Sequence, residues 1–182
     1  MPKTNQESNS AETQTRGGRT LLVKSSSANA TLSNQLFDGL VGLVNRADTK
    51  TTNSVFLTFD TVENATSALT KLQTDSSVRV KFSFYRIFFT MTGLTDTSDY
   101  NQVKSTLVSH VESNANTTVV FCKLYRKDSK YVGCGDLTVD TMEGMNTLVT
   151  ADSKLKEYTL GSLTGKFYRY NTNKSTGKPT IS

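Results

Sequence analysis

The chain has 182 residues, of which 35% are hydrophobic and 20% charged, with a formal net charge of +5 and a pI near 9.2. This composition excludes a disordered chain and leaves room for one compact domain or two small ones. The positive charge favours a polyanionic partner, and no apolar run approaches the roughly 20 residues that a membrane helix needs.

Serine and threonine make up roughly a quarter of the chain, well above average usage. This bias is typical of viral structural proteins, so a viral source is one interpretation of it. The N-terminus has no apolar signal region, which predicts a cytoplasmic or nuclear protein, or a virion component if the protein is structural. No membrane partner is expected.

Residues 1–18 are polar and show no apolar periodicity, which predicts a flexible N-terminal arm. Arg16 and Arg19 flank a glycine pair at the end of this arm. They are candidates for phosphate contacts, and a solubilising tail is the simpler alternative.

Residues 19–85 are expected to run strand, helix, strand, helix, strand. After a strand at Thr20 to Lys24, the apolar residues fall at helical spacing: Leu36, Phe37, Leu40, Leu43 and Val44. Gly39 and Gly42 weaken this helix and indicate close packing of a neighbour. Residues 45–53 are polar, so no strand is expected there. A strand from Ser54 to Asp60 and a helix from Thr61 to Leu72 follow.

The segment from Val78 to Met91 is the most aromatic and strand-like in the chain. Its apolar positions alternate with one parity up to Phe84 and with the opposite parity from Ile87 onward. A continuous strand cannot switch faces without an inserted residue, so we predict a kink at Tyr85-Arg86 that separates two halves. With no linker between them, we expect the halves to form one compact body.

Residues 86–170 are expected to form the second half, with helices from Ser98 to Glu112 and from Thr141 to Thr150. A hairpin centred on Asp128 joins two apolar runs between these helices and would place Cys122 opposite Cys134, as free thiols in a reducing compartment. Two strands follow, near Glu157 to Leu160 and Lys166 to Tyr170. Residues 171–182 contain lysine and no acidic residue, which predicts a flexible basic tail.

An internal repeat relates the two halves. Asn34-Gln35-Leu36 recurs as Asn101-Gln102-Val103 at an offset of 67, and Leu57-Thr58-Phe59-Asp60-Thr61 recurs as Leu137-Thr138-Val139-Asp140-Thr141 at an offset of 80. The 13-residue difference predicts an added strand and turn near 119–132 in the second half. Only two copies are present, which indicates a duplicated small domain and not a solenoid.

This element order, with Leu137-Thr138-Val139 leading into a helix, resembles two copies of the RNA-recognition-motif family over about Arg19 to Tyr170. The resemblance implies antiparallel four-stranded sheets backed by helices, with bases stacked on aromatics of the central strands. The expected fold class is therefore α+β, with duplicated ferredoxin-like halves and flexible N- and C-terminal arms.

The family's two signatures correspond to Ile87-Phe88-Phe89 and to residues 52–59, with 132–139 in the second copy. They put Phe88 and Phe56 on the open face of a sheet. Four other positions carry aromatics in the family but not in this chain: Leu22, Ser54, Cys134 and Asp136.

The resemblance predicts a protein that binds single-stranded RNA. Phe56, Tyr85 and Phe88 are the candidate stacking residues, and the candidate phosphate contacts are basic: Arg79, Lys81, Arg86, Arg16, Arg19, Lys166 and Arg169. The alternative is that another half or subunit covers the aromatics. The protein would then be a self-assembling homo-oligomer such as a viral coat or nucleocapsid subunit.

Nothing in the sequence indicates catalysis. It contains no glycine-rich phosphate loop, no metal-ligand spacing and no nucleophile beside a base. The single histidine, His110, falls on the apolar stripe of a predicted helix. We therefore expect a non-enzyme without catalytic residues, metal or cofactor.

Overall fold

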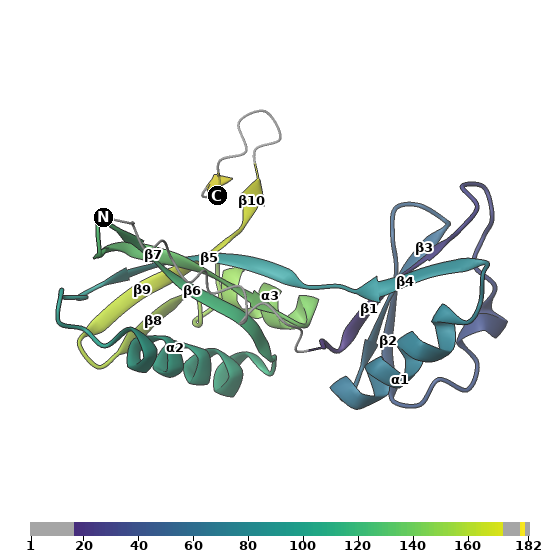
Figure 1. Ribbon diagram of the computed structural model, residues 1–182, viewed down its shortest axis with the longest axis horizontal. Coiled ribbons are helices and arrows are strands. Elements are labelled where there is room, and N and C mark those ends of the chain that lie inside the picture. Colours follow the sequence, from purple (N-terminus) through teal and green to yellow (C-terminus); the bar gives the residue numbers. More distant parts are fainter. Residues whose placement is uncertain (1–16, 173–178, 181–182) are drawn as a thin grey trace, which may run out of the picture.

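The computed structural model of the protein describes residues 17–172 and 179–180 (Figure 1). The first half consists of β1 (Thr20–Ser25), the 3-10 helix η2 (Asn34–Phe37), β2 (Leu43–Asp48), β3 (Ser54–Phe59), α1 (Val62–Gln73) and β4 (Val78–Phe82). The second half consists of β5 (Tyr85–Thr92), α2 (Tyr100–Ala115), β6 (Val119–Lys127), β7 (Lys130–Val139), α3 (Met142–Val149), β8 (Glu157–Leu160) and β9 (Leu163–Arg169). Beyond it, β10 (Asn171–Thr172) pairs with β11 (Pro179–Thr180).

Each half builds one antiparallel sheet. The strand order is β2-β3-β1-β4 in the first sheet and β6-β7-β5-β9-β8 in the second. Apart from the added edge strand β8, the two orders are the same, with the first and third strands of each half in the centre. Helices cover one face of each sheet, as in the RNA-recognition-motif fold. The α+β class and the duplicated ferredoxin-like architecture are confirmed.

The two halves form separate lobes joined at a narrow waist (Figure 1). Buried apolar side chains make two clusters, one drawn from residues 21–78 and the other from residues 87–167. The expectation of one compact body is wrong, because each sheet buries its apolar face under helical segments of its own half.

The aromatic segment from Val78 to Met91 divides into β4 and β5, which belong to different sheets (Figure 1). The break lies at Ser83 and Phe84, two residues before the predicted kink. The physical cause is the predicted change of parity, since Val80 packs against the first core and Ile87 lies in the second.

The predicted helix through Leu36 to Val44 is wrong. The chain makes only the four-residue η2 and then enters β2. Gly39 and Gly42 between them have φ angles of 72° and 74°. This left-handed conformation ends a helix, and glycine adopts it at the lowest cost. The two glycines therefore interrupt the helix. The predicted close neighbour is present at Gly42, where an added side chain would meet Asp60 and Asn64.

The first half contains the second strand that was not expected from the sequence. β2 pairs with β3 along its length, with Asp48 opposite Val55. The 13 extra residues of the second half do not add a strand. They lie largely in the first helical segment, because α2 has 16 residues and η2 has 4. The segments at Asn34 and Asn101 thus match in sequence and differ in structure.

The β6–β7 hairpin turns at Asp128 and Ser129, which have φ angles of 52° and 66°. These angles suit a two-residue turn of the type that favours tight hairpins. The pairing register then shifts partway along the hairpin, so that Cys122 lies opposite Leu137 and not opposite Cys134. The predicted cysteine pairing is wrong because the turn is centred between Asp128 and Ser129, not on Asp128, and because the register then shifts. Both thiols are free.

The predicted arms fall mainly outside the described residues. Of the N-terminal arm the structure describes Gly17 and Gly18, and of the basic tail it describes the short strands β10 and β11. Every helix in the described part of the chain is too short or too polar to span a bilayer.

Candidate nucleic-acid interface

The face of the first sheet that α1 leaves uncovered has a small apolar centre surrounded by cations. Leu22 on β1 lies between Phe56 on β3 and Lys81 on β4. Lys24 lies beside Arg79, two residues further along β1. Phe56 and Leu22 are half-buried, and all three cations are exposed. We call these five residues the first open face.

Strand alternation explains why these side chains share a face. Leu21 and Val23 of β1 are buried in the core, so Leu22 and Lys24 point the other way. Phe56, Arg79 and Lys81 were predicted as site residues, and the structure brings these three together.

The charge of the first open face is not compensated within the protein. In the described part of the chain, no carboxylate pairs with Lys24, Arg79 or Lys81. Its aromatic centre is therefore bordered by three cations that remain available to an anionic ligand.

The corresponding face of the second sheet is more closed. Phe88 lies between Asp136 on β7 and Tyr168 on β9, and only 8% of it is exposed. The ring centroids of Phe88 and Tyr168 are 6.3 Å apart. Phe88 is thus on the predicted face but is covered, and the half-exposed Tyr168 forms the outer aromatic surface. We call Arg86, Phe88, Asp136 and Tyr168 the second open face.

Arg86 is held by a network on this second open face. Its Nε lies 2.7 Å from Oδ2 of Asp136, whose side chain is 2% exposed, while that of Arg86 is 47% exposed. The Arg86 guanidinium also lies 4.0 Å from the ring centroid of Tyr170. Burial lowers the pKa of Arg86, but the hydrogen bond and charge of Asp136 outweigh it and raise the pKa.

Tyr125 joins the same network from β6. Burial raises the pKa of its phenol, and so do its hydrogen bond to Asp136 and the charge of that carboxylate. The buried carboxylate of Asp136 therefore has Arg86 as its charge partner and the neutral phenol of Tyr125 as a hydrogen-bond partner, which offsets the cost of its burial. Arg86 was predicted as a phosphate contact. The structure gives it a structural partner and leaves about half of its side chain accessible.

Two predicted site residues lie on the helix side of the second sheet. Tyr85 packs against the second core, and burial raises its pKa. Arg169 donates to Asn146 of α3 at 3.1 Å. Both residues are removed from the candidate surface, because their strand positions have the parity of the core residues. Lys166 has the open-face parity but pairs with Glu157 at 2.6 Å.

Arg19 has a different role from the one predicted. Its Nε lies 2.8 Å from Oδ2 of Asp140 in the other half, and its backbone N–H donates to the same oxygen at 3.2 Å. Its guanidinium is thus occupied at the waist and does not belong to an arm. We call this contact the Arg19–Asp140 clasp. Arg16 lies outside the described residues.

Several residues of the two faces were missed from the sequence. Lys24 shares the parity of Leu22, and Tyr168 has the parity opposite to the buried Phe167. Alternation along β1 and β9 was a usable signal for these two. Tyr125 and Tyr170 carried no such signal, because they reach Asp136 and Arg86 only through the register of the folded sheet.

The remaining reactive groups do not form a catalytic arrangement among the described residues. No group of three or more His, Cys, Asp or Glu side chains there is placed to hold a metal ion. Burial raises the pKa of Cys122 to about 12 and also raises that of Cys134, so both thiols are protonated at neutral pH. Burial lowers the pKa of His110. That the protein is a non-enzyme stays a prediction.

Comparison with known proteins gives matches in structure alone. No protein-family model and no curated protein matches the sequence. The C. elegans NONO-1 homodimer is similar at 17% identity and a TM-score of 0.35, over 82% of this chain and 60% of that one. The first two RRM domains of yeast poly(U)-binding protein Pub1 are similar at 14% identity and a TM-score of 0.30, over 83% and 98% of the two chains. The Sxl-lethal protein/RNA complex is similar at 12% identity and a TM-score of 0.29, over 82% and 99%.

Proposed function

We propose that the protein is a non-enzymatic RNA-binding protein that binds single-stranded RNA on its open faces. The observation that carries the proposal is the set of three cations around Phe56 that have no carboxylate partner among the described residues, on the sheet face opposite α1. Cations bind phosphates, and an aromatic ring stacks with any base. Single strands present splayed bases to such a ring, whereas a duplex keeps its bases stacked inside.

RNA is proposed over DNA because the strand order and the signature positions resemble the RNA-recognition-motif family. The two open faces would contribute unequally. The first supplies cations around Phe56 that no carboxylate of the described residues pairs with, and the second supplies Tyr168 with Arg86 already paired to Asp136. We therefore expect the first open face to contribute more of the salt-dependent affinity.

Filter binding of a single-stranded RNA across a salt series tests the proposal with single variants. Lys81→Ala or Arg79→Ala should weaken binding and reduce the salt slope by roughly 0.7 for each phosphate that the protein no longer neutralises. Phe56→Ala should cost about 1 to 3 kcal/mol of binding free energy with little change in slope. Tyr168→Ala should act in the same way through the second open face.

Lys71→Ala is the matched control, because Lys71 lies on α1, away from the open face, and donates to the carbonyl of Asp38. It removes the same charge and should leave the RNA affinity unchanged. Phe88→Ala is unsuitable because Phe88 is buried and its loss would disturb the sheet. Equal affinity for RNA in the Lys81, Arg79 and Phe56 variants and the wild type would reject the first open face as the site.

A second candidate function is self-assembly as a viral coat or nucleocapsid subunit. It is favoured by β2, an edge strand that carries the 63% exposed Val44, with the 73% exposed Val41 just before it. An exposed edge with apolar side chains is a template for pairing with another chain. Size-exclusion chromatography with light scattering, with and without nuclease, separates the two candidates. A nuclease-resistant particle that no longer forms in the Val44→Lys variant supports assembly. A monomer whose elution shifts to a larger size when RNA is added supports the RNA-binding protein.

A further inference from the structure

The waist between the lobes is crossed by only two segments of the described chain. One is Ser83-Phe84, which joins β4 to β5, and the other is Gly17 to Arg19, which leads into β1. Domains joined by so small a connection move relative to each other unless a specific contact prevents it. The contacts of Gly17 to Arg19 therefore decide whether the lobes hold one orientation.

The Arg19–Asp140 clasp has the geometry of a strong and specific contact. Asp140 is completely buried. Its Oδ2 accepts from the backbone N–H and Nε of Arg19, at 3.2 and 2.8 Å, and its Oδ1 lies 3.3 Å from Nη2 of the same residue. Such a two-oxygen, planar pairing restricts direction as well as distance. Arg19 Nη2 also donates to the carbonyl of Asn116, at 3.1 Å.

The second half holds Asp140 ready for this contact. Thr117 Oγ1 and the backbone N–H of Thr118 donate to Oδ1 of Asp140 at 3.0 and 2.8 Å. From the first half, Thr20 Oγ1 donates to the carbonyl of Asp140 at 2.8 Å. Among the described residues, Arg19 and Thr20 donate the hydrogen bonds between the halves. Asp140 accepts all of them except the one to the carbonyl of Asn116.

Close backbone approach supports the same contact. A side chain on Gly18 would place its first carbon 2.7 Å from Phe84 and 3.2 Å from Asp140. The rings of Phe82 and Phe84 are stacked, with centroids 6.1 Å apart. The glycine pair thus lies against an aromatic surface at the waist, and the segment fits there only without side chains.

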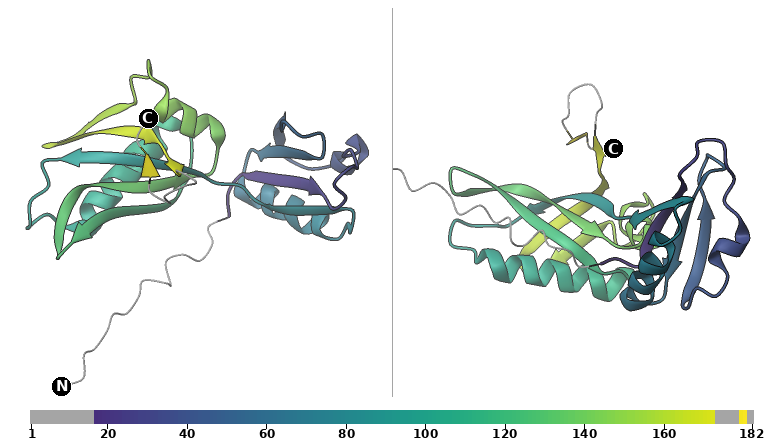
Figure 2. Two further views of the ribbon diagram at one scale, coloured as in Figure 1. Left: turned by 90° about the horizontal axis from the view of Figure 1, so that it is seen from above. Right: turned by 45° about the vertical axis from the view of Figure 1, so that its right-hand side comes forward.

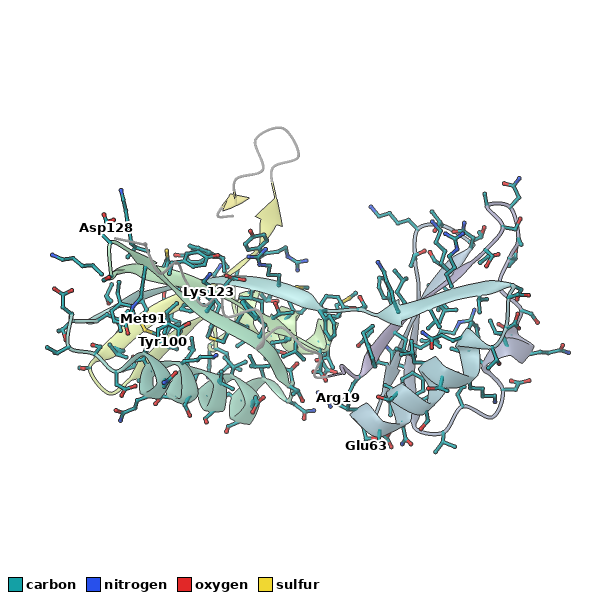
Figure 3. The ribbon with its side chains drawn as sticks, in the orientation of Figure 1. Arg19, Glu63, Met91, Tyr100, Lys123 and Asp128 are labelled. Atoms are coloured by element: carbon teal, nitrogen blue, oxygen red, sulfur yellow. The ribbon has the colours of Figure 1, made fainter. Side chains whose placement is uncertain are left out.

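The clasp relates the two open faces. β4 and β5 run end to end across the waist, and the strands lie in front of α1 and α2 when the molecule is seen from above (Figure 2). Arg79 and Lys81 on β4 and Arg86 on β5 therefore line one side of the molecule. At about 3.3 Å per residue, the ribbon of β4 and β5 is roughly 50 Å long. Figure 3 shows Arg19 at the waist, between the side chains of the two lobes.

We propose that Arg19 is a positioning residue whose clasp on Asp140 aligns the two open faces, so that one continuous single strand of RNA binds across both lobes. This inference rests on the proposed RNA binding and adds the path and length of the ligand. When one strand binds the first open face, it is present at a high effective concentration beside the second face. Two freely tumbling lobes gain less affinity from this effect than two aligned lobes.

Binding of a short and a long oligouridylate to the full chain tests the inference. The short one, of about 4 nucleotides, fits one face, and the long one, of about 16, spans both. Wild-type protein should bind the long oligomer at least roughly 100-fold more tightly than the short one. Arg19→Ala should reduce this ratio about tenfold and leave the affinity for the short oligomer unchanged.

Two further variants and one structural readout sharpen the test. Arg19→Lys keeps the charge but loses the two-oxygen pairing and should give an intermediate ratio. Arg46→Ala is the matched control, because Arg46 pairs with Asp48 and lies over the ring of Phe37, both in its own half. Small-angle X-ray scattering of the unbound proteins should show a broader distribution of lobe distances for Arg19→Ala than for Arg46→Ala. Thermal melting confirms that each variant is folded.

The failures are distinguishable. If wild-type protein binds neither oligomer, the proposed function fails and this inference fails with it. If both oligomers bind but Arg19→Ala retains the wild-type ratio, the inference alone is overturned. It is also overturned if Arg19→Ala and the wild type give the same scattering.

Discussion

The two halves share one sheet order but differ in how they complete it. In the second half, the 16-residue α2 covers the sheet and buries Val103, Leu107 and Val111. In the first half, η2 occupies the same place in the chain order and contributes Phe37 to the core, with Leu36 partly buried. The sheet order and the helix after the third strand are therefore enough to form this fold. The first helical segment tolerates replacement by a short turn.

The entry into the second helical segment is the best preserved part of the repeat. Thr61 accepts from the backbone N–H of Asn64, and Thr141 accepts from that of Gly144. Each threonine follows an aspartate and caps its helix in the same way. The shared local signal thus produces the same structure in both halves, although the residues before it diverge.

The open faces differ in charge compensation. In the first, three cations surround Phe56 without a carboxylate partner among the described residues. In the second, Arg86 pairs with the buried Asp136, and Phe88 is covered. The same sheet order therefore supports an exposed cationic face in one half and a partly closed, ion-paired face in the other.

The largest expected effect separates the two helical segments. Leu107→Ala should destabilise the second half by about 3 kcal/mol, because Leu107 is completely buried on α2. Leu36→Ala, on η2, should cost about 1 kcal/mol because η2 holds it only partly buried. Urea unfolding followed by hydrogen exchange in each half measures both. Equal costs would contradict the conclusion that η2 contributes less to its core than α2.

The next effect compares the open faces. Arg86→Ala leaves Asp136 buried without its charge partner and should cost roughly 1 to 3 kcal/mol of stability. Lys81→Ala removes an exposed cation and should cost about 0.5 kcal/mol or less. Thermal or urea unfolding checks both variants. Adding Asp136→Asn to Arg86→Ala should restore part of the loss, and a failure to do so would argue against the ion pair as its source.

A smaller effect is expected at the turn that replaces the helix. Gly42→Ala should cost about 1 to 2 kcal/mol because of its positive φ, and the new side chain would also displace the hydrogen-bonded pair of Asp60 and Asn64. Gly161→Ala is the matched control, since Gly161 has a φ of 62° and open space around it. Urea unfolding should show a larger loss for Gly42→Ala. The reverse order would mean that the turn at Gly42 is less constrained than the hairpin at Gly161.

The last comparison concerns acid and the Arg19–Asp140 clasp. Burial raises the pKa of Asp140, but the hydrogen bond from Arg19, the Thr118 N–H and the charge of Arg19 outweigh it and hold the pKa below its usual value. A lowered carboxyl pKa contributes stability that is present above the unfolded value of about 3.9 and is lost as pH falls through the folded value. Asp140→Asn should therefore flatten the acid limb of a stability profile below about pH 4. An unchanged pH dependence below about pH 4 would show that other carboxylates cause the loss of stability in acid.

Much of the fold was predictable because its signals are local. Apolar and strand-forming residues located eight strands that the structure retains within a few residues, and apolar residues at helical spacing located the helices that begin after Thr61 and Thr141. The parity change in the aromatic segment correctly separated the two sheets. Of the candidate site, Phe56, Arg79 and Lys81 followed from the same alternation, because a strand residue's face depends only on its neighbours along the chain.

The rest was decided by contacts between residues distant in sequence. The spacing from Leu36 to Val44 suits a helix, but the left-handed glycines and pairing with β3 make Leu43–Asp48 a strand. Arg19 looks like an arm residue until the fold brings it to Asp140, 121 residues away.

Local sequence thus set the order of strands and capped helices, since alternation and capping act over a few residues. The register of the β6–β7 hairpin, the closure of the second open face and the clasp at the waist depend instead on the tertiary structure. Each of these follows from which groups the folded chain brings together, and a buried carboxylate in particular requires a charge partner. For that reason Arg86, Arg19 and Lys81 look alike in sequence, yet only Lys81 remains without a carboxylate partner among the described residues.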